Sequence, residues 1–312
     1  MDLKIREFEI SILKSLRNNS NQFFDSLFKI FTFLGEPVTL VLILLVIYFM
    51  YDKQFGKKLT FTVFSSLLIN NVVKGLVKYP RPYDYDNSLN SYGKSTATGY
   101  SFPSGHTQIA STLYFGIAKD SKIERKLNIE KSFIWILAFL FIILVAFSRV
   151  YLGVHYPKDV IVGILLGIGC SFLFSFIYDK FSKKYEEWIY LITLLIYLPF
   201  VTIFIKDTYS QMYPYKDFYT IYSLFLGFTI ACIIEKKYIN FTCNVSFKTK
   251  LLRIAIGGLV AVAYIVGLKA LFPKDNMFFV CLRYFLTSLL TMGIYPLVFR
   301  KTLFTNKNEV TI

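Results

Sequence analysis

Repeated apolar stretches, each near 20 residues long, restrict what this chain can fold into. Of its 312 residues, 55% are hydrophobic, and the mean hydropathy is +0.51. A soluble domain seldom carries such stretches, whereas a helix needs about 20 apolar residues to cross the hydrocarbon core of a bilayer. The sequence therefore predicts an all-α, polytopic membrane helical bundle.

About nine transmembrane helices are expected, preceded by a helix of another kind. Residues 3–19 place apolar side chains at helical spacing between Lys and Arg, which predicts an N-terminal amphipathic helix lying in the membrane interface. Residues 22–34 form a second short apolar segment, a candidate for a re-entrant segment. The expected spans are about 36–51, 58–78, 103–118, 133–151, 159–178, 188–205, 218–234, 251–272 and 277–299.

Charge along the chain gives an orientation and a boundary. The net charge of +15 would suggest nucleic acid as the partner of a soluble protein, but in a membrane protein loop Lys and Arg orient the spans, so we expect no nucleic acid partner. The loops 52–58, 119–132, 179–187 and 235–250 and the tail from 300 hold 18 Lys and Arg, far more than the opposite connections. The first set is therefore predicted to be cytoplasmic, and the opposite connections face outward. The N-terminal helix is basic and is also predicted to face outward, which departs mildly from the rule that Lys and Arg gather on the cytoplasmic side.

The sequence shows neither a signal peptide nor a cysteine motif for metal or disulfide bonds. Residues 1–20 carry charges throughout, so no cleavable signal peptide is expected. The four cysteines form no CxxC pair, which favours packing over a metal site or a disulfide framework.

Three polar clusters at the ends of expected spans hold the only two histidines of the chain. The first cluster contains Lys74 and Arg81, and the third contains Arg149. Cations that converge from different segments at one membrane face indicate an anion site, because arginine matches the oxygens of phosphate and lysine adds a point charge. For Lys74 alone, a simpler interpretation is that its ammonium reaches the membrane interface.

The second and third clusters supply titratable groups. Ser104, Gly105 and His106 open a span directly after Pro103, where free backbone N–H groups suit a phosphate. His155 precedes Asp159 by four residues, and a carboxylate that accepts one ring N–H leaves the other nitrogen free to attack. The simpler interpretations are a helix cap for the second cluster and a loop histidine bonded to a capping aspartate for the third.

Two imidazoles beside one phosphate-shaped pocket suggest a division of labour. One can attack phosphorus while the other protonates the departing oxygen, and the cations neutralise the remaining oxygens. The sequence has no cluster of carboxylates that would indicate a site for a divalent metal ion. We therefore expect metal-independent chemistry without a cofactor.

The three clusters together resemble the phosphatidic acid phosphatase type 2 superfamily. Its pattern is Lys, six residues, Arg-Pro; then Pro-Ser-Gly-His; then Ser-Arg, five residues, His, three residues, Asp, and every spacing matches here. The resemblance covers about residues 1–180. It implies that His155 is the nucleophile that forms a phosphohistidine, that Asp159 supports it, and that His106 protonates the leaving group. It also implies that the phosphate is held by Lys74, Arg81, Ser104, Gly105 and Arg149.

The resemblance implies a substrate class and a domain organisation. We expect a catalytic membrane domain over 1–183 and C-terminal membrane helices of unknown role over 184–312. The expected activity is hydrolysis of lipid phosphate monoesters or pyrophosphates, such as phosphatidate or undecaprenyl pyrophosphate, at the outer face of a bacterial plasma membrane. Membrane lipids are the expected surroundings, and the sequence does not indicate an oligomeric state.

Two other functions stay open at this point. One is a lipid phosphotransferase of the same fold, which passes the phosphoryl group to an acceptor other than water. Only an analysis of the products would distinguish it from a hydrolase. An anion transporter is disfavoured because the sequence shows no inverted repeat.

Overall fold

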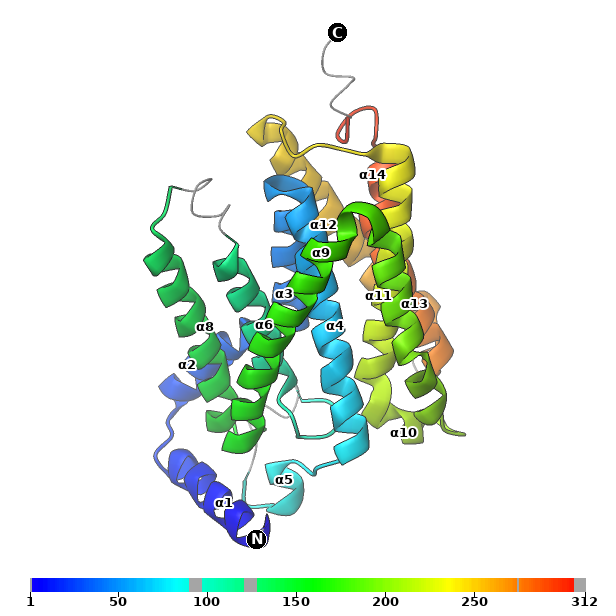
Figure 1. The fold of residues 1–312 in the computed structure, drawn as a ribbon. Coiled ribbons are helices and arrows are strands. Elements are labelled where there is room, and N and C mark those ends of the chain that lie inside the picture. Colours follow the sequence, from blue (N-terminus) through cyan, green and yellow to red (C-terminus); the bar gives the residue numbers. More distant parts are fainter. Residues whose placement is uncertain (1, 90–96, 121–127, 274, 306–312) are drawn as a thin grey trace. The chain divides into compact units, whose positions relative to one another are not determined.

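The computed structural model describes residues 2–89, 97–120, 128–273 and 275–305, which are largely helical, as predicted (Figure 1). Contacts divide the chain into two compact units. Unit 1 comprises Met1–Leu40 and Ser65–Ser175, and unit 2 comprises Val41–Phe64 and Phe176–Ile312. Each unit combines segments from separate parts of the sequence, so the units do not correspond to the expected domains 1–183 and 184–312. That division of the chain stays a prediction.

The described part of the chain contains helices of very different lengths. In chain order they are α1 (Asp2–Asn18), α2 (Gln22–Phe33), α3 (Pro37–Val46), α4 (Lys53–Val77), α5 (Pro82–Tyr85), α6 (Gly105–Lys119), α8 (Lys131–Tyr151), α9 (Pro157–Ile203), α10 (Tyr209–Met212), α11 (Lys216–Ile234), α12 (Phe247–Leu271), α13 (Met277–Leu289) and α14 (Tyr295–Val298). Short π-helical segments, η1 (Ile47–Tyr51), η4 (Glu235–Ile239) and η5 (Leu290–Ile294), continue α3, α11 and α13, and the 3-10 turn η3 (Tyr213–Tyr215) precedes α11.

The multi-pass character is confirmed, but the count of nine spans is not. Among the described residues, six helices are long and apolar enough to cross a membrane, and the bent pair of α2 with α3 and η1 would make seven. Helix α6 has 15 residues, fewer than the roughly 20 that a bilayer requires. The element α9 covers both expected spans, 159–178 and 188–205. It consists of two helices joined across a kink at Tyr185, whose φ of −128° and ψ of 33° are not helical, so the two expected spans remain separate helices.

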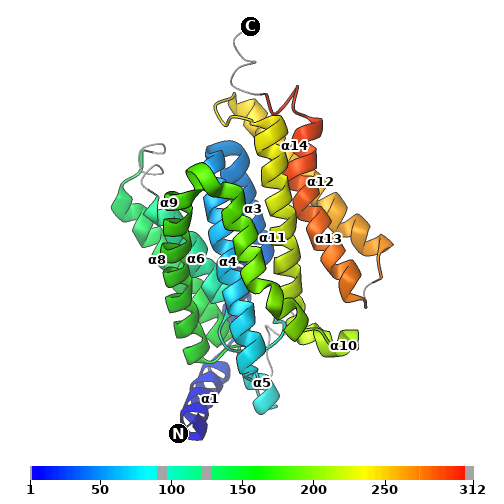
Figure 2. The ribbon, with the colours of Figure 1, turned by 45° about the vertical axis from the view of Figure 1, so that its right-hand side comes forward.

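Within unit 1, α6, α8 and the first part of α9 run side by side (Figures 1 and 2). Two glycines let α9 approach α6 closely. A Cβ at Gly163 would lie 2.9 Å from the carbonyl oxygen of Ser104, and one at Gly167 would lie 2.5 Å from Cβ of Ser111. Small residues four apart are a common means of close helix packing in membranes. The contact brings the beginnings of α6 and α9 together.

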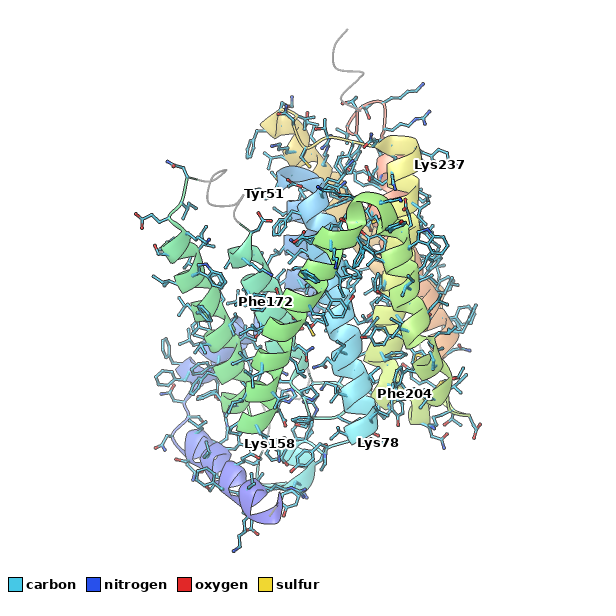
Figure 3. The ribbon with its side chains drawn as sticks, viewed as in Figure 1. Tyr51, Lys78, Lys158, Phe172, Phe204 and Lys237 are labelled. Carbon is cyan, nitrogen blue, oxygen red and sulfur yellow. The ribbon has the colours of Figure 1, made fainter. Side chains whose placement is uncertain are left out.

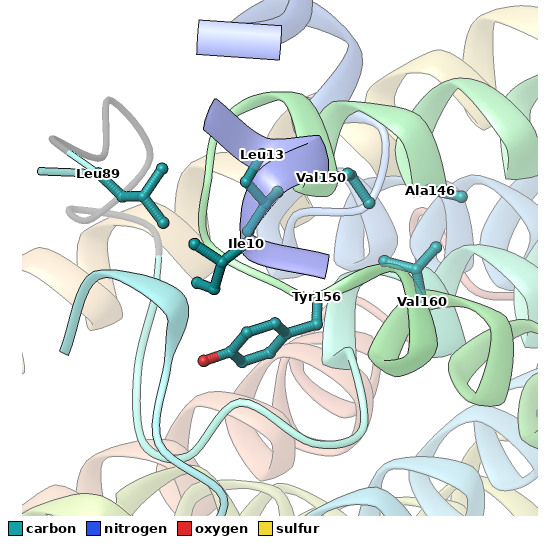
Figure 4. Close-up of a cluster of buried hydrophobic side chains, with 7 residues drawn as sticks. All are labelled: Ile10, Leu13, Leu89, Ala146, Val150, Tyr156 and Val160. Atoms are coloured by element: carbon teal, nitrogen blue, oxygen red, sulfur yellow. The ribbon is translucent and has the colours of Figure 1, made fainter. Parts of the chain in front are cut away.

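Helix α1 is formed as predicted, and its inner face is buried against unit 1. Ile10 and Leu13 pack with Val150 of α8 and with Tyr156 and Val160 at the beginning of α9 (Figure 4). The opposite face exposes apolar side chains, including Phe8 at 66%. The placement of α1 in a membrane interface stays a prediction.

Polar contacts also fix α1 to the connections near its partners. Glu9 Oε1 accepts the backbone N–H of Lys158 at 2.9 Å, and its second oxygen lies 3.3 Å from Lys158 Nζ. Arg6 Nε donates to the hydroxyl of Tyr79 at 2.8 Å, and Lys158 Nζ donates to the same hydroxyl at 2.9 Å. Lys158, labelled in Figure 3, thus links α1 to the segment that follows α4.

Unit 2 contains a buried set of ion pairs. Lys57 Nζ lies 2.9 Å from Glu235 Oε2 and 3.5 Å from Glu186 Oε2. The hydroxyls of Tyr178 and Tyr190 donate to Glu186 Oε1 at 2.6 and 3.1 Å. A buried charge is tolerated only when it is paired and hydrogen-bonded, so these side chains stabilise unit 2 only as a complete set.

Replacing Lys57 with Met is therefore expected to destabilise the protein strongly. The substitution leaves the buried carboxylates of Glu186 and Glu235 without this cation, which should lower the free energy of unfolding by about 3–5 kcal/mol. Lys58→Met is the matched control, because Lys58 pairs at 2.6 Å with a largely exposed Asp179 and should change stability by less than about 1 kcal/mol. Thermal unfolding in detergent measures both, and equal effects would contradict the structural role of Lys57.

Candidate functional site

The three polar clusters meet at one end of unit 1. Helices α4 and α8 end there, and α6 and α9 begin there. Lys78 and Lys158 mark this end in Figure 3. Because successive helices run in alternate directions, the segments 74–82, 103–106 and 148–159 come to the same place although they are far apart in the sequence.

Arg81 is the most highly connected cation of the site. Its side chain is buried, and it donates from Nε to the carbonyl of Gly99 at 3.0 Å and from Nη2 to that of Thr98 at 2.6 Å. Nη1 donates to the carbonyl of Val154 at 2.9 Å and lies 3.3 Å from Nε2 of His155. One guanidinium therefore joins the loop before α6 to the loop before α9 and contacts the imidazole.

These contacts assign the proton of His155. Because a guanidinium only donates, Nε2 of His155 must be the acceptor toward Arg81, and the ring proton is on Nδ1. Nδ1 lies 3.3 Å from Asp159 Oδ2, which also accepts the hydroxyl of Ser101 at 2.5 Å and the backbone N–H of Tyr156 at 3.1 Å. The lone pair of His155 thus faces the cation that an anionic substrate would approach.

The surroundings of His155 favour its neutral form. Burial, followed by the positive charges of Arg81, Lys74 and Arg149, holds the pKa of His155 well below its usual value. A neutral imidazole keeps an unprotonated nitrogen, which here is Nε2, the atom that lies beside Arg81.

The remaining phosphate-binding candidates surround this centre. Lys74 Nζ donates to the carbonyl of Tyr100 at 2.6 Å and lies 3.4 Å from that of Ser101. Its ammonium is buried, so Lys74 does not simply reach out to the interface. A Cβ at Gly105 would lie 3.9 Å from Cε of Lys74, so the first turn of α6 faces this cation.

Ser104 links two of the helix beginnings. Its backbone N–H donates to the carbonyl of Asp159 at 3.0 Å. Its buried hydroxyl lies 3.0 Å from the hydroxyl of Thr107, so the two side chains share a hydrogen bond. Ser104 thereby holds the beginning of α6 against the first turn of α9.

Arg149 and His106 lie beside the turn between α2 and α3. Arg149, fully buried at the end of α8, donates from Nη1 to the hydroxyl of Thr32 at 2.6 Å. Nε2 of His106 lies 3.2 Å from Oε1 of Glu36. The sequence interpretation assigned neither Thr32 nor Glu36 to the site. The one local signal was the Gly35-Glu36-Pro37 break between two apolar segments.

All eight residues predicted for the site lie in unit 1. Direct contacts join one group around Arg81 and His155, while Arg149 and His106 are joined to the turn between α2 and α3. The positive charge of Arg149 is also among the causes that lower the pKa of His155. Among the described residues, no group of three or more His, Cys, Asp or Glu side chains could hold a metal ion.

The low pKa of His155 can be tested directly because the chain has only two histidines. In His106→Ala, His155 is the only histidine, and NMR of ¹³C-labelled histidine should show a neutral ring at pH 6 with a titration midpoint below about 6.5. The same variant unfolded in denaturant serves as the control and should titrate near about 6.5. A folded midpoint at or above the unfolded one would contradict the assigned environment.

Comparison with known proteins places this site in a family. Residues 55–183 match the family model described as the PAP2 superfamily, and residues 219–307 match the one described as PAP2 superfamily phosphatase, transmembrane extension. A crystal structure of a PAP2-type phosphatidylglycerolphosphate phosphatase from Bacillus subtilis is 25% identical, with a TM-score of 0.48, and the match covers 58% of this chain and 89% of that one.

Two curated relatives show similar levels of identity. An undecaprenyl-diphosphatase of Sulfolobus acidocaldarius is 34% identical over 137 residues, which are 44% of this chain and 60% of that protein. Phosphatidylglycerophosphatase B of Bacillus subtilis is 33% identical over 141 residues, which are 45% of this chain and 66% of that protein. The chain thus spans less than two thirds of the length of these relatives. From the two family models and the matching motifs, this chain belongs to the PAP2 superfamily, the phosphatidic acid phosphatase type 2 proteins.

Proposed function

We propose that this protein is an integral membrane phosphatase that hydrolyses lipid phosphate monoesters or diphosphates through a phosphohistidine intermediate. The observation that carries the proposal is the arrangement around His155. Asp159 accepts the proton side of the ring, and Arg81 lies 3.3 Å from the nitrogen that bears the lone pair. An anion drawn to Arg81 is therefore brought to the nucleophile.

The chemistry follows from these positions. Nε2 of His155 attacks phosphorus, and the departing oxygen takes a proton from His106. Asp159 stabilises the charge that develops on the His155 ring, as in other histidine–carboxylate pairs. Lys74, Arg81 and Arg149, with the N–H groups of the first turn of α6 around Ser104 and Gly105, neutralise the phosphoryl oxygens. Water then attacks the phosphohistidine, His106 accepts its proton, and phosphate is released.

A lipid substrate is supported by the relatives and by the location of the site. The curated relatives include a phosphatidylglycerophosphatase, an undecaprenyl-diphosphatase and a lipid A 1-phosphatase of Rhizobium johnstonii. The site lies at the ends of helices, where the head group of a membrane lipid can enter from the side. The proposed reaction needs no metal ion, because three cationic side chains neutralise the phosphoryl oxygens that a metal ion would otherwise neutralise.

The location follows from the distribution of Lys and Arg. We place the protein in a bacterial plasma membrane with the site facing outward, and α1 at the outer interface.

Replacing the nucleophile tests the reaction. His155→Ala should lower phosphate release from lipid phosphates by roughly a thousandfold or more, because attack by a positioned nucleophile is lost. The measurement is phosphate release by purified protein over a panel of lipid monophosphates and diphosphates, with and without a chelator. Wild-type protein should give a ³²P-labelled, acid-labile phosphoenzyme that is absent from His155→Ala.

The folded state of the variant is checked by its thermal unfolding. A folded His155→Ala protein that keeps full activity would refute the assigned nucleophile. Loss of wild-type activity in the chelator would refute metal-independent hydrolysis.

Labelling of single cysteines tests the orientation. In a cysteine-free background, Ser88→Cys should react with a membrane-impermeant maleimide in intact cells, because exposed Ser88 lies in the connection after α5, near the site. Lys301→Cys, in the exposed tail, should react only after the cells are permeabilised. The reverse pattern would place the site on the cytoplasmic side.

A further inference from the structure

Each of the two histidines of the site has its own carboxylate. His155 is paired with Asp159, which belongs to the matching motif. His106 is paired with Glu36, whose Oε1 lies 3.2 Å from Nε2 of the ring. Glu36 precedes the segment 55–183 that matches the family model, so neither the motif nor the match assigns it a role.

The turn that carries Glu36 is held firmly against His106. A Cβ at Gly35 would lie 2.7 Å from Cγ1 of Val145 and 3.0 Å from the carbonyl oxygen of His106, so only glycine allows this close approach. The hydroxyl of Tyr114, on α6, donates to the carbonyl of Leu34 at 2.9 Å. The position of Glu36 beside the ring is therefore built by packing and does not depend on a flexible side chain alone.

Burial opposes the protonated form of His106 most strongly, and the positive charges around the ring add to this effect. Arg149 and Arg81 both act on its ring, Lys74 lies beside the preceding residue Gly105, and His155 is the neighbouring titratable group. A general acid must carry a proton before it can donate one. Within this positive surrounding, the carboxylate of Glu36 supplies the negative charge that favours an imidazolium at His106.

We propose that Glu36 is a positioning residue that holds His106 as the proton donor and thereby selects lipid phosphate monoesters over diphosphates. This inference rests on the proposed function of the same site. The carboxylate lies at ion-pair distance from Nε2 of the His106 ring, so in this proposal the N–H at Nδ1 serves the leaving group.

The selection follows from the bond that breaks. In a monoester, the N–P bond to His155 forms as the P–O bond to the lipid alcohol breaks, and the leaving alkoxide takes the proton of His106. In a diphosphate, the leaving group is a lipid phosphate, which is far less basic and needs that proton less. Its negative charge would also be repelled by the carboxylate of Glu36. Both effects favour the monoester.

Glu36→Gln removes the charge and keeps the shape of the side chain. The value of kcat/KM for a long-chain alkyl phosphate should fall about 10- to 100-fold, because a general acid contributes a factor of this order or more. The value for an aryl phosphate with an acidic phenol and that for a lipid diphosphate should change less than about threefold. The alkaline limb of the pH profile for the alkyl phosphate should move to lower pH, and Glu36→Asp should recover part of the loss.

Glu9→Gln is the matched control. It removes the charge of another buried carboxylate of unit 1, which is bonded to Lys158 and not to a histidine. It should leave the ratio of alkyl to aryl phosphate hydrolysis and the alkaline limb unchanged.

The outcomes separate this inference from the proposed function. Equal losses on all three substrates in Glu36→Gln, with an unchanged pH profile, would show a merely structural role and overturn the inference while the phosphatase activity stands. Wild-type preference for the diphosphate would overturn the substrate class. Absence of wild-type activity on every lipid phosphate would overturn the proposed function and this inference with it.

Discussion

The hydrogen bonds of the Arg81 guanidinium are the constraint on which the rest of the site depends. Its donors are shared among backbone carbonyls of two loops and the ring of His155. Moving either loop would leave buried N–H groups without acceptors, which costs about 1–3 kcal/mol for each group. The loops are therefore fixed around a permanent positive charge before any substrate arrives, and this preorganisation is what an enzyme needs to stabilise a developing anion.

The two units use buried charge for different purposes. In unit 2, Lys53 and Lys57 pair with Glu186 and Glu235, so the two positive charges balance the two negative ones and keep the fold of this unit intact. In unit 1, Lys74, Arg81 and Arg149 donate to neutral oxygens of the backbone and of Thr32, which hold these buried cations in place. In the proposed reaction, the same three cations face the phosphoryl oxygens of the substrate.

The sequence predicted the parts of the site that depend on local spacing. His155 and Asp159, four residues apart around the beginning of α9, are in contact because the turn into a helix brings such positions together. The contacts of His106 with Glu36 and of Arg149 with Thr32 join residues far apart in the chain and depend on how α2 packs on α8, for which no local pattern exists. The count of nine spans is not confirmed. The boundary predicted at the charged segment 179–187 coincides with the kink at Tyr185, where the backbone leaves helical geometry.

The turn between α2 and α3 carries Glu36, which lies outside the motif that supplies the other residues of the proposed site. In the proposed reaction, the motif residues bind and transfer the phosphoryl group, whereas Glu36 acts on the group that departs. These two requirements reside in different stretches of sequence, one inside the family-matching segment and one ahead of it. Under this proposal, a change within the first forty residues would alter which leaving group this chain accepts and would leave its phosphate-binding motif intact.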